Sequence, residues 1–211
     1  MFTPNDLARA LESLPRKAYP AMPGRTNHLH AGILVPMVWK PDPRCIMTER
    51  SHELRLHAGE VAFPGGRPDP EDIDLYHTAA REAREEADLQ ITKRLGELSN
   101  FPLYTSDYRL FPFVAEVNSS GSVVDPGEVA SILEIPIMEM LGRPFFHAIP
   151  SHYQEREILC PTFEWGSLVI FGGTAFVLLE LLQVCAQIVD QPLPPLVAGK
   201  YQWSELLGSR A

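Results

Sequence analysis

Cysteine is scarce in this chain of 211 residues, and its three copies lie far apart. Cys45, Cys160 and Cys185 form no C-x-x-C pair, so we expect neither a disulfide framework nor a zinc site of that spacing. The first residues also lack the basic segment followed by an apolar one that marks a secretory signal peptide. These absences predict a reduced protein in the cytoplasm.

Basic residues are in the minority, with 18 Lys and Arg against 27 Asp and Glu, which gives a net charge of −9. Such acidity disfavours general binding to nucleic acids or to anionic membranes, because those partners usually need a basic face. It does not disfavour a polyanionic substrate, because a divalent cation held by carboxylates reverses the local field. We therefore expect a small-molecule substrate, no nucleic acid and no membrane.

A continuous apolar run long enough to cross a membrane is missing as well. Residues 167–189 contain no Lys or Arg, but Gly172-Gly173 interrupt the stretch, and Glu180, Gln183 and Gln187 recur in it at helical spacing. This pattern favours a buried strand followed by a core helix. A hydrophobic fraction of 45% with 21% charged residues is that of an ordinary globular protein, which excludes intrinsic disorder.

The apolar periodicity and the turn residues predict one mixed α/β domain over residues 1–211. An N-terminal helix and loop would occupy residues 1–27, the core 28–190 and a C-terminal tail 191–211. The predicted helices are 3–14, 75–87, 136–141 and 173–189. The predicted strands are 31–40, 44–48, 60–63, 97–103, 108–117, 128–135 and 162–171. Residues 118–127 read as a loop, and 145–161 as irregular, with strand character only at 157–159.

The predicted helix at 75–87 carries an unusual acidic face. Glu82, Glu85 and Glu86 are spaced i, i+3 and i+4, so their side chains lie on one side of the helix. Stacked like charges destabilise an isolated helix by about 0.2–0.5 kcal/mol per pair. A hard divalent cation such as Mg²⁺ would resolve that repulsion. Alternatively, Arg81 and Arg84 neutralise a merely solvated face, and the helix by itself leaves both interpretations open.

The segment before this helix ends a strand with Gly65-Gly66, followed by the acidic residues Asp69, Glu71 and Asp72. A double glycine at this point makes either a tight turn or a close approach of the backbone to a ligand.

Taken together, this segment and the helix resemble the box of the Nudix hydrolases, G-x5-E-x7-R-E-U-x-E-E-x-G-U, where U is aliphatic. Gly66 opens the box, and residues 81–86 (REAREE) supply its core. Three departures occur. Asp72 stands in place of the first Glu, eight residues rather than seven separate it from Arg81, and Asp88 replaces the last Gly.

A second element, TERS at 48–51 with LRLHAGEVAFPGG at 54–66, is similar to the one that flanks the box in the coenzyme A pyrophosphohydrolase branch. The extra residue inside the box is also similar to that branch. The resemblance covers residues 31–137 and continues weakly at 171–175.

The resemblance implies a Nudix fold, an α/β/α sandwich around a mixed sheet in which the box forms a loop–helix–loop. It implies hydrolysis of the diphosphate linkage of coenzyme A (CoA) or acyl-CoA to 3′,5′-ADP and (acyl-)4′-phosphopantetheine, with Mg²⁺ or Mn²⁺. Glu82, Glu85 and Glu86 would bind the metal, Arg81 would fix their geometry, and Glu128 is the candidate general base. The alternatives are a Nudix pyrophosphatase acting on ADP-ribose, NADH or another nucleoside diphosphate derivative, and a non-catalytic nucleotide-binding Nudix domain.

Candidate substrate-binding residues flank the box. Diphosphates and a 3′-phosphate favour arginine partners, and Arg50, Arg55 and Arg67 lie nearby in the sequence, with Gly65 and Gly66. Each arginine has a plain alternative as a surface ion-pair partner, and Glu128 has one as a solvent-facing residue at a strand edge. A homodimer, common in the family, would have a candidate contact in the apolar residues of the helix at 3–14.

Overall fold

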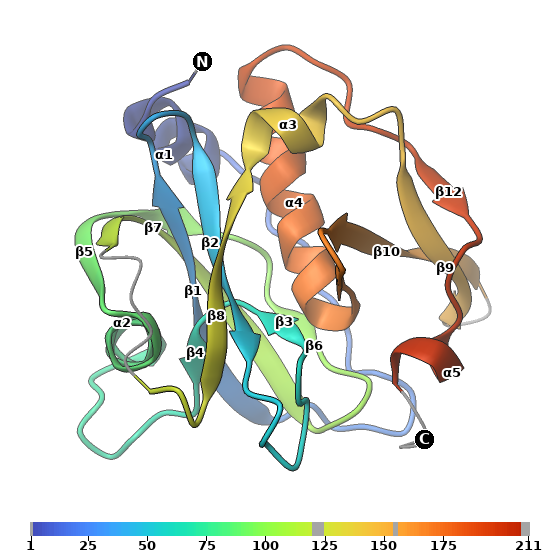
Figure 1. Cartoon of the computed structure of the whole chain (residues 1–211), viewed down its shortest axis with the longest axis horizontal. Helices are drawn as coiled ribbons and strands as arrows, with labels where there is room; N and C mark the ends of the chain where they lie inside the picture. Colours follow the sequence, from blue (N-terminus) through green and yellow to red (C-terminus); the bar gives the residue numbers. More distant parts are fainter. Residues whose placement is uncertain (1, 120–124, 154–155, 208–211) are drawn as a thin grey trace.

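The computed structural model describes residues 2–119, 125–153 and 156–207. A mixed sheet of eight strands forms its larger part (Figure 1). The strands follow the order β3-β2-β1-β7-β5, with β4 beside β1, β6 beside β7 and β8 beside β2. Their bounds are β1 Leu29–Val38, β2 Arg44–Arg50, β3 Val61–Ala62, β4 Gly65–Gly66, β5 Leu89–Glu97, β6 Phe101–Pro102, β7 Tyr108–Ser119 and β8 Val129–Pro136.

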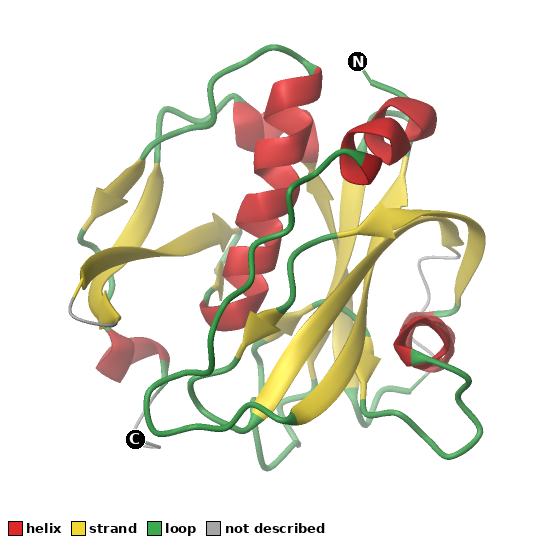
Figure 2. Cartoon of the chain, turned by 180° about the vertical axis from the view of Figure 1, so that it is seen from behind, coloured by secondary structure: helices red, strands yellow, loops and turns green. Residues whose placement is uncertain are grey.

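Helices cover both faces of this sheet, as the alternation of side chains along β1 requires. Leu34 packs with Ala79 and Ala83 of helix α2 (Leu75–Ala87) on one face. Ile33 and Val35 point to the other face, into the larger core beneath α1 (Pro4–Glu12), α3 (Ile137–Leu141) and α4 (Gly172–Ile188). Figures 1 and 2 show α2 and α4 on opposite sides of the sheet. The predicted α/β/α arrangement is confirmed.

A second sheet of four strands lies beyond α4, which is placed between the two sheets in both views (Figures 1 and 2). Phe146, Phe163 and Ile170 from this sheet belong to the same core cluster as the residues of α4. The strand order is β11-β10-β9-β12. The bounds are β9 Phe146–Tyr153, β10 Arg156–Trp165, β11 Leu168–Ile170 and β12 Leu196–Ala198, with the short helix α5 at Trp203–Leu206.

This second sheet corrects the sequence prediction of an irregular segment at 145–161, because residues 146–153 and 156–161 belong to strands β9 and β10. Two prolines obscured the strands, and both lie where a strand lacks a neighbour on one side. Pro150 follows the part of β9 that pairs with β12, and Pro161 precedes the part of β10 that pairs with β11. The predicted strand at 162–171 is the end of β10 and β11, joined by a turn.

Two further predictions were wrong or incomplete. The strand expected at 97–103 is two strands, β5 and β6, and β5 begins at Leu89. The polar residues of β5 hid it, because β5 is an edge strand of the sheet and exposes its charges. The expected tail at 191–211 contributes β12 and α5. Of the predicted loop at 118–127, residues 120–124 lie outside the described part of the chain.

Helix α1 begins as predicted, with Thr3 as its N-cap and Pro4 at the first position. Its apolar face is turned inward, since Leu7 and Leu11 are 0% and 5% exposed and belong to the protein's own core. These leucines therefore do not form the dimer contact suggested by the sequence. Among the helices of the described residues, none has both the length and the apolar character needed to span a membrane.

Candidate active site

Helix α2 has the predicted bounds, 75–87, and an aspartate lies at each of its ends. Asp74 caps the first turn by accepting a hydrogen bond from the His77 N–H at 2.8 Å. Asp88 ends the helix in the left-handed conformation, with φ at +48°. The Nudix box that the sequence resembles has glycine at this position. Aspartate is one of the few other residues that adopt this conformation readily. This departure therefore leaves the helix end unchanged.

The double glycine of β4 lets the acidic face of α2 lie directly on the sheet. A Cβ atom at Gly66 would be 2.4 Å from Oε1 of Glu82, so a larger residue there would displace that carboxylate. Gly65 has φ at +156°, and a Cβ atom there would be 2.5 Å from the carbonyl oxygen of Gly32. Gly66 is thus explained by the close approach of the Glu82 side chain, and Gly65 by its positive φ and the close approach of the β1 backbone.

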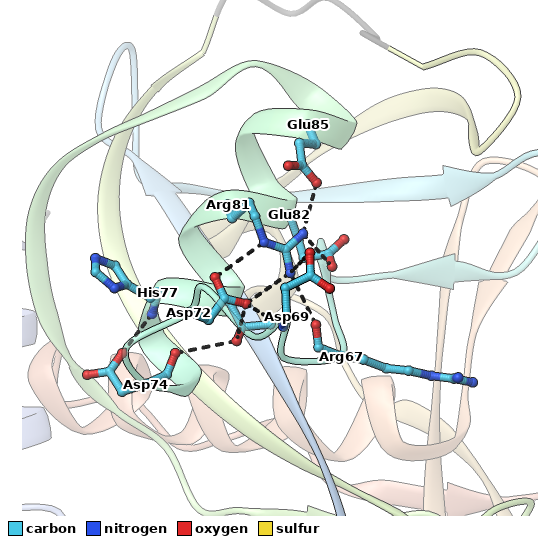
Figure 3. A network of polar contacts seen from close by, with 9 residues as sticks. Arg67, Asp69, Asp72, Asp74, His77, Arg81, Glu82 and Glu85 are labelled. Carbon is cyan, nitrogen blue, oxygen red and sulfur yellow. Dashed lines mark hydrogen bonds and ion pairs between the residues drawn. The ribbon is translucent and has the colours of Figure 1, made fainter.

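Arg81 gathers the carboxylates of this region into what we call the Arg81 cluster: Arg81, Asp72, Glu82 and Glu85 (Figure 3). Its guanidinium lies 3.1 Å from Oδ2 of Asp72 and 3.0 Å from both Glu82 Oε1 and Glu85 Oε2. It also donates to the backbone carbonyl of Arg67 at 3.1 Å. Within this cluster one cation therefore faces three carboxylates, and two of them, Glu82 and Glu85, are predicted metal ligands.

Asp72 fastens this cluster to the loop before the helix. Its carboxylate accepts hydrogen bonds from the Thr78 hydroxyl and from the Asp69 N–H, both at 2.9 Å. The hydrogen bond from Arg81, followed by that from Asp69, lowers the pKa of Asp72 to about 2. The same contact with Asp72 is the largest cause that raises the pKa of Arg81. Both groups are charged throughout the neutral range.

Glu86 lies in a different environment, the Glu86 pocket, which we define as Glu86, Gly65, Arg50 and Glu128. Glu86 is only 5% exposed. Burial, followed by the charges of Glu82 and Glu128, raises its pKa to about 8, although the charge of Arg50 and the Gly65 N–H oppose the shift. Burial also raises the pKa of Glu82, against the opposing effect of Arg81.

The adjoining ends of β2 and β8 place Arg50 and Glu128 in this pocket. The pairing of β2 with β8 shifts register between Glu49 and Arg50, and the Ser51 N–H then bonds the Glu128 carbonyl at 2.8 Å. The Nε of Arg50 is buried and has no hydrogen-bond partner within the described structure. A buried donor without a partner is rare in a folded protein, and at a candidate site this N–H is available to an anionic ligand.

The donors near α2 are carboxylate oxygens, which are the ligands that Mg²⁺ and Mn²⁺ prefer. Within residues 2–119, 125–153 and 156–207, no three His, Cys, Asp or Glu side chains are already arranged around a common metal position. The reason is visible in the Arg81 cluster, where Arg81 holds Glu82 and Glu85. The charges of Glu82 and Glu128 both raise the pKa of Glu86, and a divalent cation would compensate this repulsion among the three carboxylates. The residues present therefore fit a divalent cation.

The three candidate substrate-binding arginines lie in three environments. Arg50 is part of the Glu86 pocket. Arg55 is exposed, and the described residues give it no hydrogen bond or ion pair. The side chain of Arg67 points away from the carboxylates in Figure 3, and its Cζ atom lies 5.0 Å from the ring centre of Tyr108. Sequence reasoning missed Tyr108, since nothing in its neighbourhood distinguishes it from other strand aromatics.

Comparison with known proteins places this arrangement in a family. The sequence profile of the NUDIX domain matches residues 28–154. The chain is 37% identical, over 161 residues, to an uncharacterized Nudix hydrolase NudL from Photorhabdus laumondii, an alignment that covers 74% of this chain and 85% of the relative. The chain belongs to the Nudix hydrolase family. A NudL protein from Yersinia pestis is 35% identical over 157 residues, which cover 72% of this chain and 78% of that protein.

A solved Nudix structure has the same fold. The MutT/nudix family protein from Enterococcus faecalis aligns with a TM-score of 0.50 and 11% identity, covering 84% of this chain and 65% of that one. Nudix hydrolases act on pyrophosphate linkages of small nucleoside diphosphate derivatives and generally use divalent metal ions. In this Nudix hydrolase Asp72, at the position of the first Glu of the box, is one of the carboxylates that pair with Arg81.

Proposed function

We propose that this Nudix hydrolase cleaves the diphosphate linkage of CoA or acyl-CoA, releasing 3′,5′-ADP and (acyl-)4′-phosphopantetheine. The observation that carries the proposal is the course of residues 48–66, the element similar to the CoA branch. These residues leave β2 at Arg50 and return to it, with the Arg50 N–H donating to the Glu60 carbonyl at 2.9 Å and the Gly59 N–H donating to the Arg50 carbonyl at 3.1 Å. The element thereby holds Arg50 beside Glu86 and leads directly into Gly65-Gly66.

Glu82, Glu85 and Glu86 would hold the divalent cation, which when bound neutralises the diphosphate and activates the attacking water. Arg81 keeps Glu82 and Glu85 in reach of that position through the contacts of the Arg81 cluster. Arg50 would donate from its buried Nε to a diphosphate oxygen, which supplies the partner that this atom lacks.

Backbone at Gly65 and Gly66 would admit the diphosphate close to β4, with Arg55 and Arg67 binding more distant parts of the substrate. Glu128 would accept the proton of the water as the oxygen attacks phosphorus and the bridging P–O bond breaks. Each product then retains one phosphate of the cleaved diphosphate linkage, and 3′,5′-ADP also keeps the 3′-phosphate of CoA.

The experiment is turnover of CoA with Mg²⁺ and with Mn²⁺, with the products resolved by chromatography. Dephospho-CoA, ADP-ribose and NADH are assayed alongside under the same conditions. We expect 3′,5′-ADP from CoA at a kcat/KM well above those of the other three substrates. Preferential cleavage of ADP-ribose or NADH would overturn the CoA assignment and retain the carboxylate mechanism, whereas cleavage of none would favour a nucleotide-binding role.

We further propose that residues 1–211 act as one domain in the cytoplasm. Residues of both sheets and of α1, α3 and α4 share one core cluster, which supports a single folding unit. All three cysteines are buried free thiols, which suits a reducing compartment.

A further inference from the structure

A cation–π pair lies at the edge of the candidate site, and the part of the substrate that its arginine would bind has not been specified so far. The guanidinium of Arg67 lies over the ring of Tyr108, the first residue of β7, with 5.0 Å between Cζ and the ring centre. This distance is within the range of a cation–π contact. The two residues come from distant parts of the chain, so the fold itself brings them together.

Arg67 differs from the other stacked arginines in what surrounds it. Arg94 and Arg143 also lie over aromatic rings, but each has a carboxylate partner, at 2.6 and 3.9 Å. Arg67 is exposed, and within the described structure it has no carboxylate partner, although Asp69 and Glu71 follow close behind it in the chain. Its outer face and its N–H groups therefore remain open to a ligand.

The backbone of Arg67 is fixed to the site. Its carbonyl oxygen accepts the hydrogen bond from Arg81, and its neighbour Gly66 lies beneath the carboxylate of Glu82. The side chain of Arg67 extends away from Arg81 and Glu82, as Figure 3 shows. A ligand that spans from the metal-binding glutamates to this side chain would have an anionic part at one end and a part with a π face at the other.

We propose that the nucleobase of the substrate stacks on the outer face of the Arg67 guanidinium, with Tyr108 supporting that guanidinium from behind. The proposal rests on a nucleoside diphosphate substrate, as in the proposed function. A planar guanidinium offers a flat surface and in-plane donors that an ammonium group does not. Tyr108 acts as a positioning residue, because it holds the guanidinium plane in place.

The test compares binding of three small probes to the full-length protein by isothermal titration calorimetry: ribose 5-phosphate, AMP and 3′,5′-ADP. None contains a diphosphate linkage, so the result is independent of whether CoA is cleaved. We expect wild type to bind AMP about tenfold more tightly than ribose 5-phosphate, a gain in the range of stacking of a base on a planar side chain. Arg67→Lys and Tyr108→Leu should both remove that gain, whereas Tyr108→Phe should keep it.

The matched control is Arg94→Lys, which alters an arginine stacked on Tyr76 at 4.4 Å, on the β5 side of α2, and should leave all three affinities unchanged. Two results would overturn the proposal. One is wild-type affinity for AMP no higher than for ribose 5-phosphate. The other combines two variants: Arg67→Lys still binds AMP more tightly than ribose 5-phosphate, and Arg67→Gln loses only the additional affinity for 3′,5′-ADP over AMP. Arg67 would then bind the 3′-phosphate by charge alone.

Discussion

Glu85 and Glu86 are adjacent in the sequence and have the same side chain, yet the fold gives them opposite environments. The side chain of Glu85 is 57% exposed and pairs with Arg81, whereas Glu86 is 5% exposed and meets other carboxylates. One step along a helix rotates the side chain by about 100°, which is enough to separate solvent from the sheet. Each carboxylate of the Arg81 cluster therefore contacts a cation directly, whereas Glu86 has no ion-pair partner among the described residues.

This difference separates two tasks of the box: Arg81 and Asp72 set the geometry of the glutamates, and Glu86 would bind the cation. Arg81 and Asp72 form a charged pair whose pKa shifts keep it ionised, so it can set geometry at any neutral pH. Glu86 lacks such a partner, so below a pH of about 8 its ionised form becomes favourable only when a cation binds beside it. A buried group of this kind costs stability, which is typical of functional sites.

The largest effect should come from removing the ligand charges themselves. Glu86→Gln and Glu85→Gln are each expected to lower kcat for CoA at least about a hundredfold, because each takes a carboxylate from the metal-binding face. The thermal midpoint of each variant should stay within a few degrees of wild type at pH 7. The measurement is steady-state turnover with saturating Mg²⁺, beside thermal unfolding, and retained activity in both variants would contradict the assignment of the metal ligands.

A smaller effect is expected from the pair that positions these ligands. Asp72→Asn removes the strongest partner of Arg81, and groups that orient metal ligands are typically worth about 10–100-fold in metal affinity or activity. Mn²⁺ affinity, followed by electron paramagnetic resonance of the free ion, should fall together with kcat/KM. Asp69→Asn is the control, since its carboxylate is 62% exposed and 3.7 Å from Arg81. If Asp72→Asn and Asp69→Asn lose the same Mn²⁺ affinity, the conclusion that Asp72 positions Arg81 more strongly than Asp69 does is wrong.

The sequence was most informative where local pattern decides structure. The bounds of α2 were predicted correctly from its apolar spacing and turn residues, and the same spacing put Glu82, Glu85 and Glu86 on one helical face. That spacing does not separate Glu85 from Glu86, because their burial depends on β4 and on the end of β2, which are distant in the chain. The role of Gly66 is of the same kind, since it depends on Glu82 sixteen positions later.

Non-local pairing explains the rest of what the sequence did not predict. Strand β12 joins the second sheet from a segment read as a tail, and its parallel partner β9 contains a proline that obscured the pattern. Tyr108 had no local signal, because its meeting with Arg67 depends on β1 separating β4 from β7 in the sheet. A contact between two side chains whose strands are separated by a third strand is not encoded in any short segment of sequence.

The smallest effect that separates the two environments is the pH dependence of stability in the metal-free protein. Glu86 keeps its proton in the folded state up to a pKa of about 8, but releases it near the ordinary value of 4.5 when the chain unfolds. Between these values the folded state binds more protons, so the free energy of unfolding contributed by Glu86 falls as pH rises through this window. Glu82 adds a change in the same direction, while Asp72, with its pKa near 2, contributes stability that is lost only as pH falls below about 4.

Thermal unfolding in EDTA at pH 5.5, 7 and 8.5 tests this sign. The wild-type midpoint should fall across the series, whereas Glu86→Gln should flatten the fall and unfold a few degrees higher than wild type at pH 8.5. Adding Mg²⁺ should raise the wild-type midpoint most at pH 8.5, where the carboxylate is free to bind it, and leave the variant less affected. Asp72→Asn is the control for a generic loss of charge, since it should keep the wild-type slope above pH 5.5. If the thermal midpoints of wild type and Glu86→Gln fall in parallel with pH, the charge of Glu86 is as well compensated as that of Glu85. The two neighbours would then differ in exposure alone.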